Sequence, residues 1–245
     1  MKVVFATPAY KRVDLSEICF KQHAWCHQEL AKQGIESTSV VVANDGNLQI
    51  AKKLGFEVVK RDNKYLGRKF NDGYQQAHKL GADYVVPLGS DSWIHPSYFS
   101  VLSKLKQGQF LTGRHYGLID EDGKRLGYLV ITVANGVGPH IIPVELMAER
   151  GYRPVQETLS RGCDGSLLQA VAPKPDKTRW LWSDRFPLQY VAFRTHGQQL
   201  NPYENLTKKY LQSESRRPWH ELRKVYPQDL VEQAERLYRA RRTRA

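Results

Sequence analysis

The chain has 245 residues, of which 41% are hydrophobic, and its formal net charge is +12. This length suits one large domain or a domain with an extension. The first apolar run, residues 3–6, is stopped by Thr7-Pro8 and is too short for a signal-peptide core or a membrane span, so we expect a soluble, cytoplasmic protein without an integral membrane segment.

Strand and helix patterns alternate through the first ninety residues. Unbroken apolar runs predict buried strands, and apolar residues at helical spacing before a glycine predict helices. The resulting order indicates a largely parallel α/β sheet with right-handed crossovers. The predicted strands are 2–8, 37–45, 56–62 and 83–91, and the predicted helices are 14–34, 48–55 and 67–81.

From Gln109 onward the pattern changes. Two β-rich runs surround the turn sequence at 120–123 and predict a hairpin. Further on, we expect a helix behind Pro143, a helix start at 162–172, a strand at 189–197 and a basic helix at 230–245.

Of the three cysteines, Cys19 and Cys26 lie on one face of the first predicted helix, which favours reduced thiols in the core.

The positive charge is uneven along the chain. Residues 205–245 carry eleven Lys and Arg against five Asp and Glu, so half of the net charge lies in the last sixth of the sequence. This gradient indicates an anionic partner such as nucleic acid, acidic lipid or a phosphorylated substrate. A solvated basic helix that only aids solubility is the alternative.

Polar residues follow each of the first four predicted strands. Since the carboxyl ends of parallel strands meet at one rim, where open α/β sheets bind ligands, these residues predict a polar crevice. Asp91 could instead only cap the turn before "WIHP". The residues are Thr7, Pro8, Tyr10, Lys11 and Arg12, then 44–47, then Asn63, then Ser90, Asp91 and Ser92.

The ligand class follows from what the crevice contains. Neither GxGxxG nor GxxxxGK[ST] occurs, which disfavours dinucleotide oxidoreductases and P-loop enzymes. Arg12, Arg68, Lys69 and the lone carboxylate of Asp91 suit a nucleoside diphosphate held by a divalent ion, with the metal bridging Asp91 to phosphate oxygens.

The segments "TPAYKR", "VVVANDGN" and "LGRKFNDGYQQAHKLGADYVVPLGSDSW" resemble the successive motifs of family 2-type, GT-A-fold glycosyltransferases. The resemblance covers residues 2 to about 96. It implies a GT-A-like, mostly parallel sheet flanked by helices, with a β-hairpin insertion. We therefore expect a catalytic domain at 1–204, made of a nucleotide-sugar half (1–96) and an acceptor half (97–204), and a basic helical extension at 205–245.

The resemblance also implies roles for individual residues. Asp45 would meet the base or ribose, Asn71 would line the diphosphate site, and Arg68 or Lys69 would supply positive charge there. The residues that would border the nucleotide are Thr7, Pro8, Tyr10 and Arg12.

The metal motif departs most from the family. Where the family has Leu-Asp-x-Asp-Asp, this chain has Leu88-Gly89-Ser90-Asp91-Ser92, so only Asp91 is retained. The resemblance implies a Mn or Mg ion on Asp91, with weakened affinity or a second ligand, for which His196 is the candidate. His196 could equally be an ordinary surface or core histidine.

Asp164 stands where the family has the general base that opens a helix. It would take the proton of the acceptor hydroxyl during one in-line, inverting displacement. A helix N-cap is the alternative role for Asp164, and Glu145, Glu149 and Glu157 are further candidates for the base.

The predicted function is therefore a metal-dependent inverting glycosyltransferase that uses a nucleoside-diphosphate sugar. A small, basic enzyme without an anchor resembles phage enzymes that glycosylate hydroxymethylated bases, so DNA is the preferred acceptor and the host cytoplasm the expected location. The alternatives are transfer to a cell-surface glycan or lipid-linked sugar, and a non-catalytic nucleic-acid-binding protein on a transferase-like scaffold.

Overall fold

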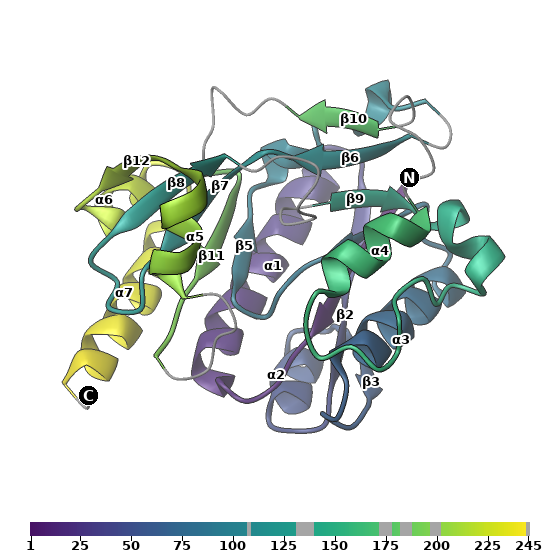
Figure 1. Ribbon diagram of the computed structural model, residues 1–245, viewed down its shortest axis with the longest axis horizontal. Helices are drawn as coiled ribbons and strands as arrows, with labels where there is room; N and C mark the ends of the chain where they lie inside the picture. The colour runs from purple at the N-terminus through teal and green to yellow at the C-terminus, as the bar shows by residue number, and fades with distance from the viewer. Residues whose placement is uncertain (107–108, 131–139, 172–177, 182–187, 197–201, 244–245) are drawn as a thin grey trace.

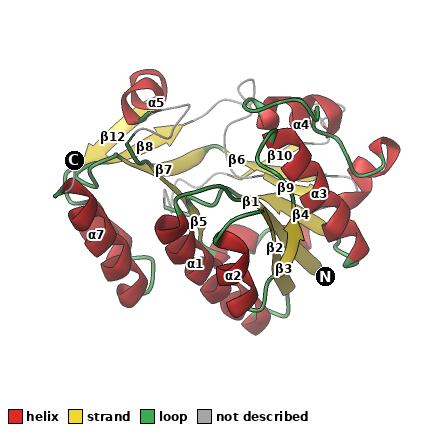
Figure 2. Ribbon diagram, turned by 90° about the horizontal axis from the view of Figure 1, so that it is seen from below, coloured by secondary structure: helices red, strands yellow, loops and turns green. Residues whose placement is uncertain are grey.

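The computed structural model describes residues 1–106, 109–130, 140–171, 178–181, 188–196 and 202–243. The described strands form two sheets, with helices on both faces of the larger one (Figures 1 and 2). The fold class is thus α/β with a mixed sheet. Within these ranges no helix combines the length and the apolar character that crossing a membrane requires.

The larger sheet has seven strands in the order β10-β6-β9-β4-β1-β2-β3. Its half formed by the N-terminal strands is parallel, as predicted, and β9 runs antiparallel to both of its neighbours. The strands are β1 (Lys2–Pro8), β2 (Glu36–Ala43), β3 (Glu57–Lys60), β4 (Tyr84–Pro87), β6 (Phe110–Gly113), β9 (His140–Pro143) and β10 (Thr178–Leu181).

Two hydrophobic layers cover this sheet. Along β1, Val4 and Ala6 pack in one cluster with Phe70 of α3, whereas Phe5 packs on the opposite face with Cys26 of α1. Alternation along a strand explains this division, since successive side chains point to opposite faces. The helices concerned are α1 (Val13–Lys32), α2 (Asn47–Lys53), α3 (Leu66–Lys79) and α4 (Cys163–Val171).

The smaller sheet has five strands in the order β12-β8-β7-β11-β5. Strands β7 and β8 form an antiparallel hairpin around the turn predicted at 120–123. The strands are β5 (Ser92–Ile94), β7 (His115–Ile119), β8 (Leu126–Val130), β11 (Tyr190–Phe193) and β12 (Leu211–Ser215).

The C-terminal helices pack against α1 and the smaller sheet. Val231 and Tyr238 share one buried cluster with Cys19 of α1 and with Trp93 and Phe193. The described part of the predicted extension therefore lies on the same core as the N-terminal helix. These helices are α5 (Tyr203–Tyr210), α6 (Pro218–Arg223) and α7 (Gln228–Arg242).

Three local predictions differ from the structure. The strand predicted over 83–91 ends at Pro87, which lacks the N–H that a ladder requires. Behind Pro143 the chain forms a 3₁₀ helix, Val144–Arg150, preceded by the unexpected strand β9. The polar segment 211–215 is a strand rather than a helix, because its backbone pairs with β8 at the sheet edge. Two further 3₁₀ helices are Pro96–Phe99 and Leu102–Lys104.

Candidate functional site

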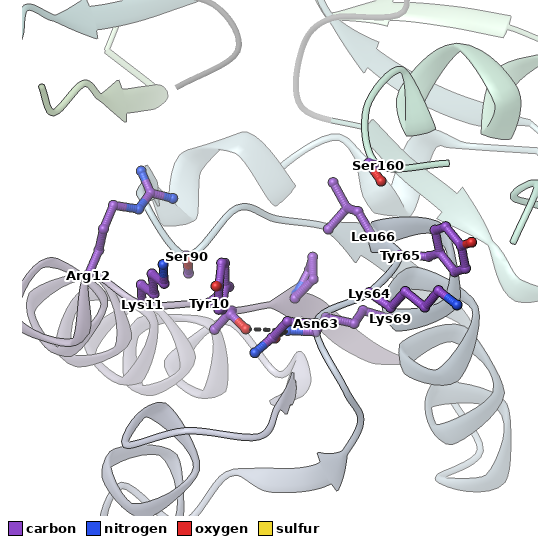
Figure 3. A pocket seen from close by; sticks show the side chains of 12 residues that line it. Tyr10, Lys11, Arg12, Asn63, Lys64, Tyr65, Leu66, Lys69, Ser90 and Ser160 are labelled. Atoms are coloured by element: carbon purple, nitrogen blue, oxygen red, sulfur yellow. Dashed lines mark hydrogen bonds between the residues drawn. The ribbon is translucent and has the colours of Figure 1, made fainter. Parts of the chain in front are cut away.

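A pocket of about 440 Å³ opens at the carboxyl end of β1, beside the segments that follow β3 and β4 (Figure 3). Four of its lining side chains are cations, two are tyrosines, and none is a carboxylate. The predicted crevice thus exists at the predicted rim of the sheet. Its lining residues are Pro8, Ala9, Tyr10, Lys11, Arg12, Asn63, Lys64, Tyr65, Leu66, Lys69, Ser90 and Ser160.

The loop after β1 has an unusual backbone. Lys11 and Arg12 have φ angles of 52° and 44°, which is the left-handed region that non-glycine residues avoid. Asp45 accepts a 2.8 Å hydrogen bond from the Lys11 N–H, and the Asn47 side chain donates 3.2 Å to the Lys11 carbonyl. These contacts hold the loop so that Tyr10, Lys11 and Arg12 line the pocket.

Lys69 is the buried cation of the pocket. It is 3% exposed, and its Nζ donates to the Ala9 carbonyl at 2.6 Å and to Asn63 Oδ1. Burial lowers the pKa of Lys69 to about 8, although the charges of Asp45 and Asp62 oppose that shift. The ammonium also lies 5.7 Å from the centre of the Tyr10 ring. An anionic ligand here would meet a partly desolvated positive charge beside an aromatic face.

Asp91 is held by two arginines. Its Oδ2 lies 3.0 Å from Arg12 Nη1 and 3.8 Å from Arg194 Nη1, and its Oδ1 accepts a 3.2 Å hydrogen bond from Ser92 Oγ. Burial by itself would raise the pKa of Asp91, but the charges of Arg12 and Arg194 and the hydrogen bonds from Arg12 and Ser92 bring it below the ordinary value. Asp91 is thus an ionised partner that fixes two guanidinium groups.

Gly89 explains part of the departure from the acidic motif. A Cβ at this position would lie 2.6 Å from Asp91 Oδ1 and 3.1 Å from Ser92 Oγ. A side chain at residue 89 would therefore displace the Asp91 carboxylate from its present position.

The donor set does not fit the expected Mn or Mg ion. Within the described ranges, no three His, Cys, Asp or Glu side chains gather as a metal-binding group. The His196 side chain is 62% exposed, and its Nε2 lies 3.0 Å from Asp122 Oδ1, whereas the Asp91 side chain is 16% exposed and faces the guanidinium groups. Waters and substrate phosphates can supply several of the oxygen ligands of such an ion, but at least one free carboxylate is still needed. Asp91 is occupied by Arg12 and Arg194, and His196 by Asp122, so neither side chain is available to a metal ion in this arrangement.

Several predicted site residues lie outside the pocket lining, and Asp45, Asp91 and Asp164 are among them. Arg68 lies 3.6 Å from Glu157 and 5.2 Å from the Tyr65 ring, so Lys69 is the one of the two cations that lines the pocket.

Thr7 is fully buried in β1. Asn71 is also buried, and its amide exchanges hydrogen bonds of 2.7 and 3.0 Å with the Val155 backbone, so it tethers a loop rather than facing a ligand.

The tethered loop, residues 152–162, leads from the 3₁₀ helix Val144–Arg150 to α4 and passes over α3. A Cβ on Gly67 would lie 2.2 Å from the Gln156 carbonyl oxygen, so the loop packs tightly on the start of α3. Along this path Ser160 reaches the pocket, and α4 begins at Cys163. Asp164 lies in the first turn of α4, one residue inside the helix, which is not the N-cap position.

Asp164 is a half-buried carboxyl group whose pKa burial raises to about 6. Both the Asp91 and the Asp164 charges act on Tyr190, whose hydroxyl donates a 2.9 Å hydrogen bond to Ser92 Oγ. Burial raises the pKa of Tyr190, and the charges of Asp91 and Asp164 raise it further, so both carboxylates lie within electrostatic reach of this tyrosine. The other base candidates are placed less well, since Glu157 pairs with Arg153 and both Glu145 and Glu149 are exposed.

Sequence reasoning missed Arg194 and Tyr65. Arg194 lies two residues before His196, the expected second metal ligand, and it is Arg194 whose side chain reaches Asp91. Tyr65 precedes α3 and lines the pocket, and its aromatic ring between two lysine-rich segments is the signal that could have identified it.

Comparison with known proteins yields solved structures alone. No family model matches, and no curated protein matches. A glycosyltransferase involved in glycosylation of the major capsid of PBCV-1 is 9% identical, with a TM-score of 0.46 over 78% of this chain and 91% of that one. A cytidylyltransferase from Leptospira borgpetersenii is 16% identical, with a TM-score of 0.43 over 74% of each chain.

An inositol-1-phosphate CTP transferase from T. maritima is 12% identical, with a TM-score of 0.44 over 80% of this chain and 89% of that one. Similarity at this level carries no argument about the function of the present chain. The functional conclusion therefore depends on the geometry of the pocket.

Proposed function

We propose that the protein binds a nucleoside-diphosphate sugar in the pocket at the end of β1 and transfers the sugar to a hydroxyl acceptor. One observation carries this proposal: Lys11, Arg12, Lys64 and Lys69 line the pocket together with two tyrosines and no carboxylate. Cationic groups suit the diphosphate, and aromatic faces suit a base or sugar ring. The volume of about 440 Å³ lies in the range of small-molecule sites.

The positive charge for the leaving diphosphate comes from the protein's own side chains in this proposal. The Lys69 ammonium is partly desolvated, and the guanidinium of Arg12 is held in place by Asp91. Fixed cations in a site with little water stabilise the charge that develops on a departing diphosphate. Arg194, held on the same carboxylate, adds a second fixed guanidinium nearby.

Asp164 is the proposed general base. As the acceptor oxygen bonds to the anomeric carbon, the bond from that carbon to the diphosphate breaks, and the acceptor proton passes to Asp164. The outcome is inversion at the anomeric carbon. A carboxyl with a pKa of about 6 is ionised at neutral pH and is still basic enough to accept this proton.

The acceptor that we propose is a hydroxymethylated base in DNA. The support is the net charge of +12 and its concentration near the C-terminus. Such a base would leave the stack to reach the pocket, at a cost of a few kcal/mol. With a cell-surface glycan or a lipid-linked sugar as the acceptor, the positive charge would have a partner only if the protein also bound an acidic membrane surface.

A screen of sugar nucleotides tests the proposal. The full chain is incubated with each donor, with and without hydroxymethylated DNA, and free nucleotide is measured. We expect release with one donor class, strongly lowered by Lys69→Met at donor concentrations below saturation and kept by Lys79→Met, which removes a cation from the other end of α3. Nucleotide binding without release in any combination would favour the non-catalytic alternative, and absence of binding to any nucleotide would refute the proposal.

A further inference from the structure

A second hollow has a volume of about 350 Å³. The helices α6 and α7, which contribute to its lining, lie at the opposite end of the molecule from α3. Three separate segments build the hollow: the turn between β7 and β8, the link from β12 into α6 together with α6 itself, and one face of α7 (Figure 1). None of the residues that line this hollow also lines the pocket at the end of β1.

The hollow has a large excess of positive charge. Its lining includes six Lys and Arg side chains and one carboxylate, Glu235. Glu235 is already shared, since it pairs with Arg223 and lies 2.6 Å from Arg239. Within the part of the chain that the structure describes, Arg216, Arg217 and Arg242 have no ion pair. These guanidinium groups can therefore bind an anion without first breaking an internal contact.

The floor of the hollow is tightly packed. Trp219 and Tyr238 are buried, with ring centroids 5.5 Å apart. Gly123 lies directly on them: a Cβ there would be 2.7 Å from Trp219 Cζ2 and 2.9 Å from Tyr238 Cδ1, and its φ of +65° also requires glycine. The hairpin turn is thus fixed against α6 and α7, which sets the position of the neighbouring Lys124. Cations on a fixed frame lose little entropy when they bind.

The cationic side chains of the hollow favour a ligand that carries several phosphates. Guanidinium groups match phosphate oxygens in pairs, and cations from three segments need several phosphates to satisfy them. Acidic lipid also attracts clustered cations, but apolar side chains that insert beside them are what would favour a membrane surface. Met1, Tyr10 and Leu211 are the exposed large hydrophobic residues of the described ranges, and none of them lines the hollow.

We propose that this hollow binds the phosphate backbone of duplex DNA. The proposal deepens the acceptor assignment made above and rests on it for the link to sugar transfer, but the binding itself requires no turnover. The hollow contributes phosphate contacts that position the duplex and carries no reading of base sequence. Tyr238 connects the hollow to the Asp91 cluster, because its hydroxyl donates to the Arg194 carbonyl.

Fluorescence anisotropy with a labelled 20-base-pair duplex tests the proposal on the full chain. The variant is Arg216→Ala/Arg217→Ala, and the matched control is Lys52→Ala/Lys53→Ala, which removes two adjacent exposed cations from α2. We expect at least a tenfold weaker Kd for the first variant at 100 mM salt and less than a twofold change for the control. Equal losses in both, or no loss in the first, would overturn the proposal.

Salt dependence and lipid binding separate the remaining outcomes. Losing two phosphate contacts should lower the slope of log K against log[salt] by about 1.8. Between 50 and 200 mM salt, the factor by which DNA affinity falls should therefore be about 12 times smaller in the variant than in the wild type. An unchanged slope would count against the site. A second result would also count against the site. The wild type would float with phosphatidylserine vesicles, and the variant would lose this flotation but keep its affinity for DNA. Nucleoside-diphosphate binding should be unchanged in the variant, so failure here is distinguishable from failure of the proposed function.

Discussion

Replacing Lys69 by methionine tests how the pocket binds a diphosphate. The side chain is buried, and its pKa lies at about 8 instead of 10.5. At about 1.4 kcal/mol per pKa unit, this environment disfavours the ammonium by roughly 3 kcal/mol. A bound anion would offset that penalty, so binding is coupled to the protonation of Lys69.

The sign of the pH effect follows from this coupling. With a pKa of about 8, Lys69 is roughly 90% charged at pH 7 and roughly 10% charged at pH 9. Affinity for a nucleoside diphosphate should therefore fall about tenfold between these pH values in the wild type. A charge-assisted hydrogen bond contributes about 1.5–3 kcal/mol, so Lys69→Met should weaken binding about 10- to 150-fold at pH 7 and show no further decline toward pH 9.

Isothermal titration calorimetry measures this difference directly. Each variant is titrated at pH 7 and pH 9 with the nucleoside diphosphate that the donor screen selects, and thermal melting verifies that the fold is kept. Lys69→Arg keeps a permanent charge, so its affinity should not depend on pH in this range. Lys79→Met, on the same helix, should behave as wild type. If Lys69→Met kept the tenfold decline toward pH 9, another group would be responsible, and the role of Lys69 would be refuted.

Three further predictions concern the base, the metal and the tethered loop. Asp164→Asn should keep nucleotide affinity but lower turnover about 10²- to 10⁴-fold, and wild-type turnover should rise with pH through about 6 as Asp164 loses its proton, measured as nucleotide release. Full turnover in Asp164→Asn would remove this residue from the mechanism. Because two arginines occupy the Asp91 carboxylate, replacing manganese by EDTA should change nucleotide affinity less than threefold by calorimetry, and a tenfold loss would contradict this assignment. Asn71→Ala should lower the free energy of unfolding by about 2 kcal/mol or more, since it leaves two buried backbone groups of Val155 unpaired. Denaturant unfolding checks this value, with Gln76→Ala as the control on the same helix, and an unchanged midpoint would show that the tether is not stabilising.

The sequence by itself determined the parallel half of the larger sheet and the rim on which the pocket lies. Unbroken apolar runs and helical periodicity are local signals, and they predict strands and helices without knowledge of distant contacts. Polar residues at successive strand ends must then meet at one edge, which is why Pro8, Tyr10, Asn63 and Ser90 line one pocket.

Tertiary structure alone decided which side chains face one another. Lys69 is buried although its neighbour Arg68 is not, because only the packing of α3 determines which lysine or arginine faces the pocket. Arg194 reaches Asp91 from a strand about a hundred residues later in the chain, through the pairing of β11 with β5 and β7. His196, two residues further on, is directed instead to Asp122. The pairing of strands that are distant in the chain sets these contacts, and the local sequence of one strand does not identify its partner.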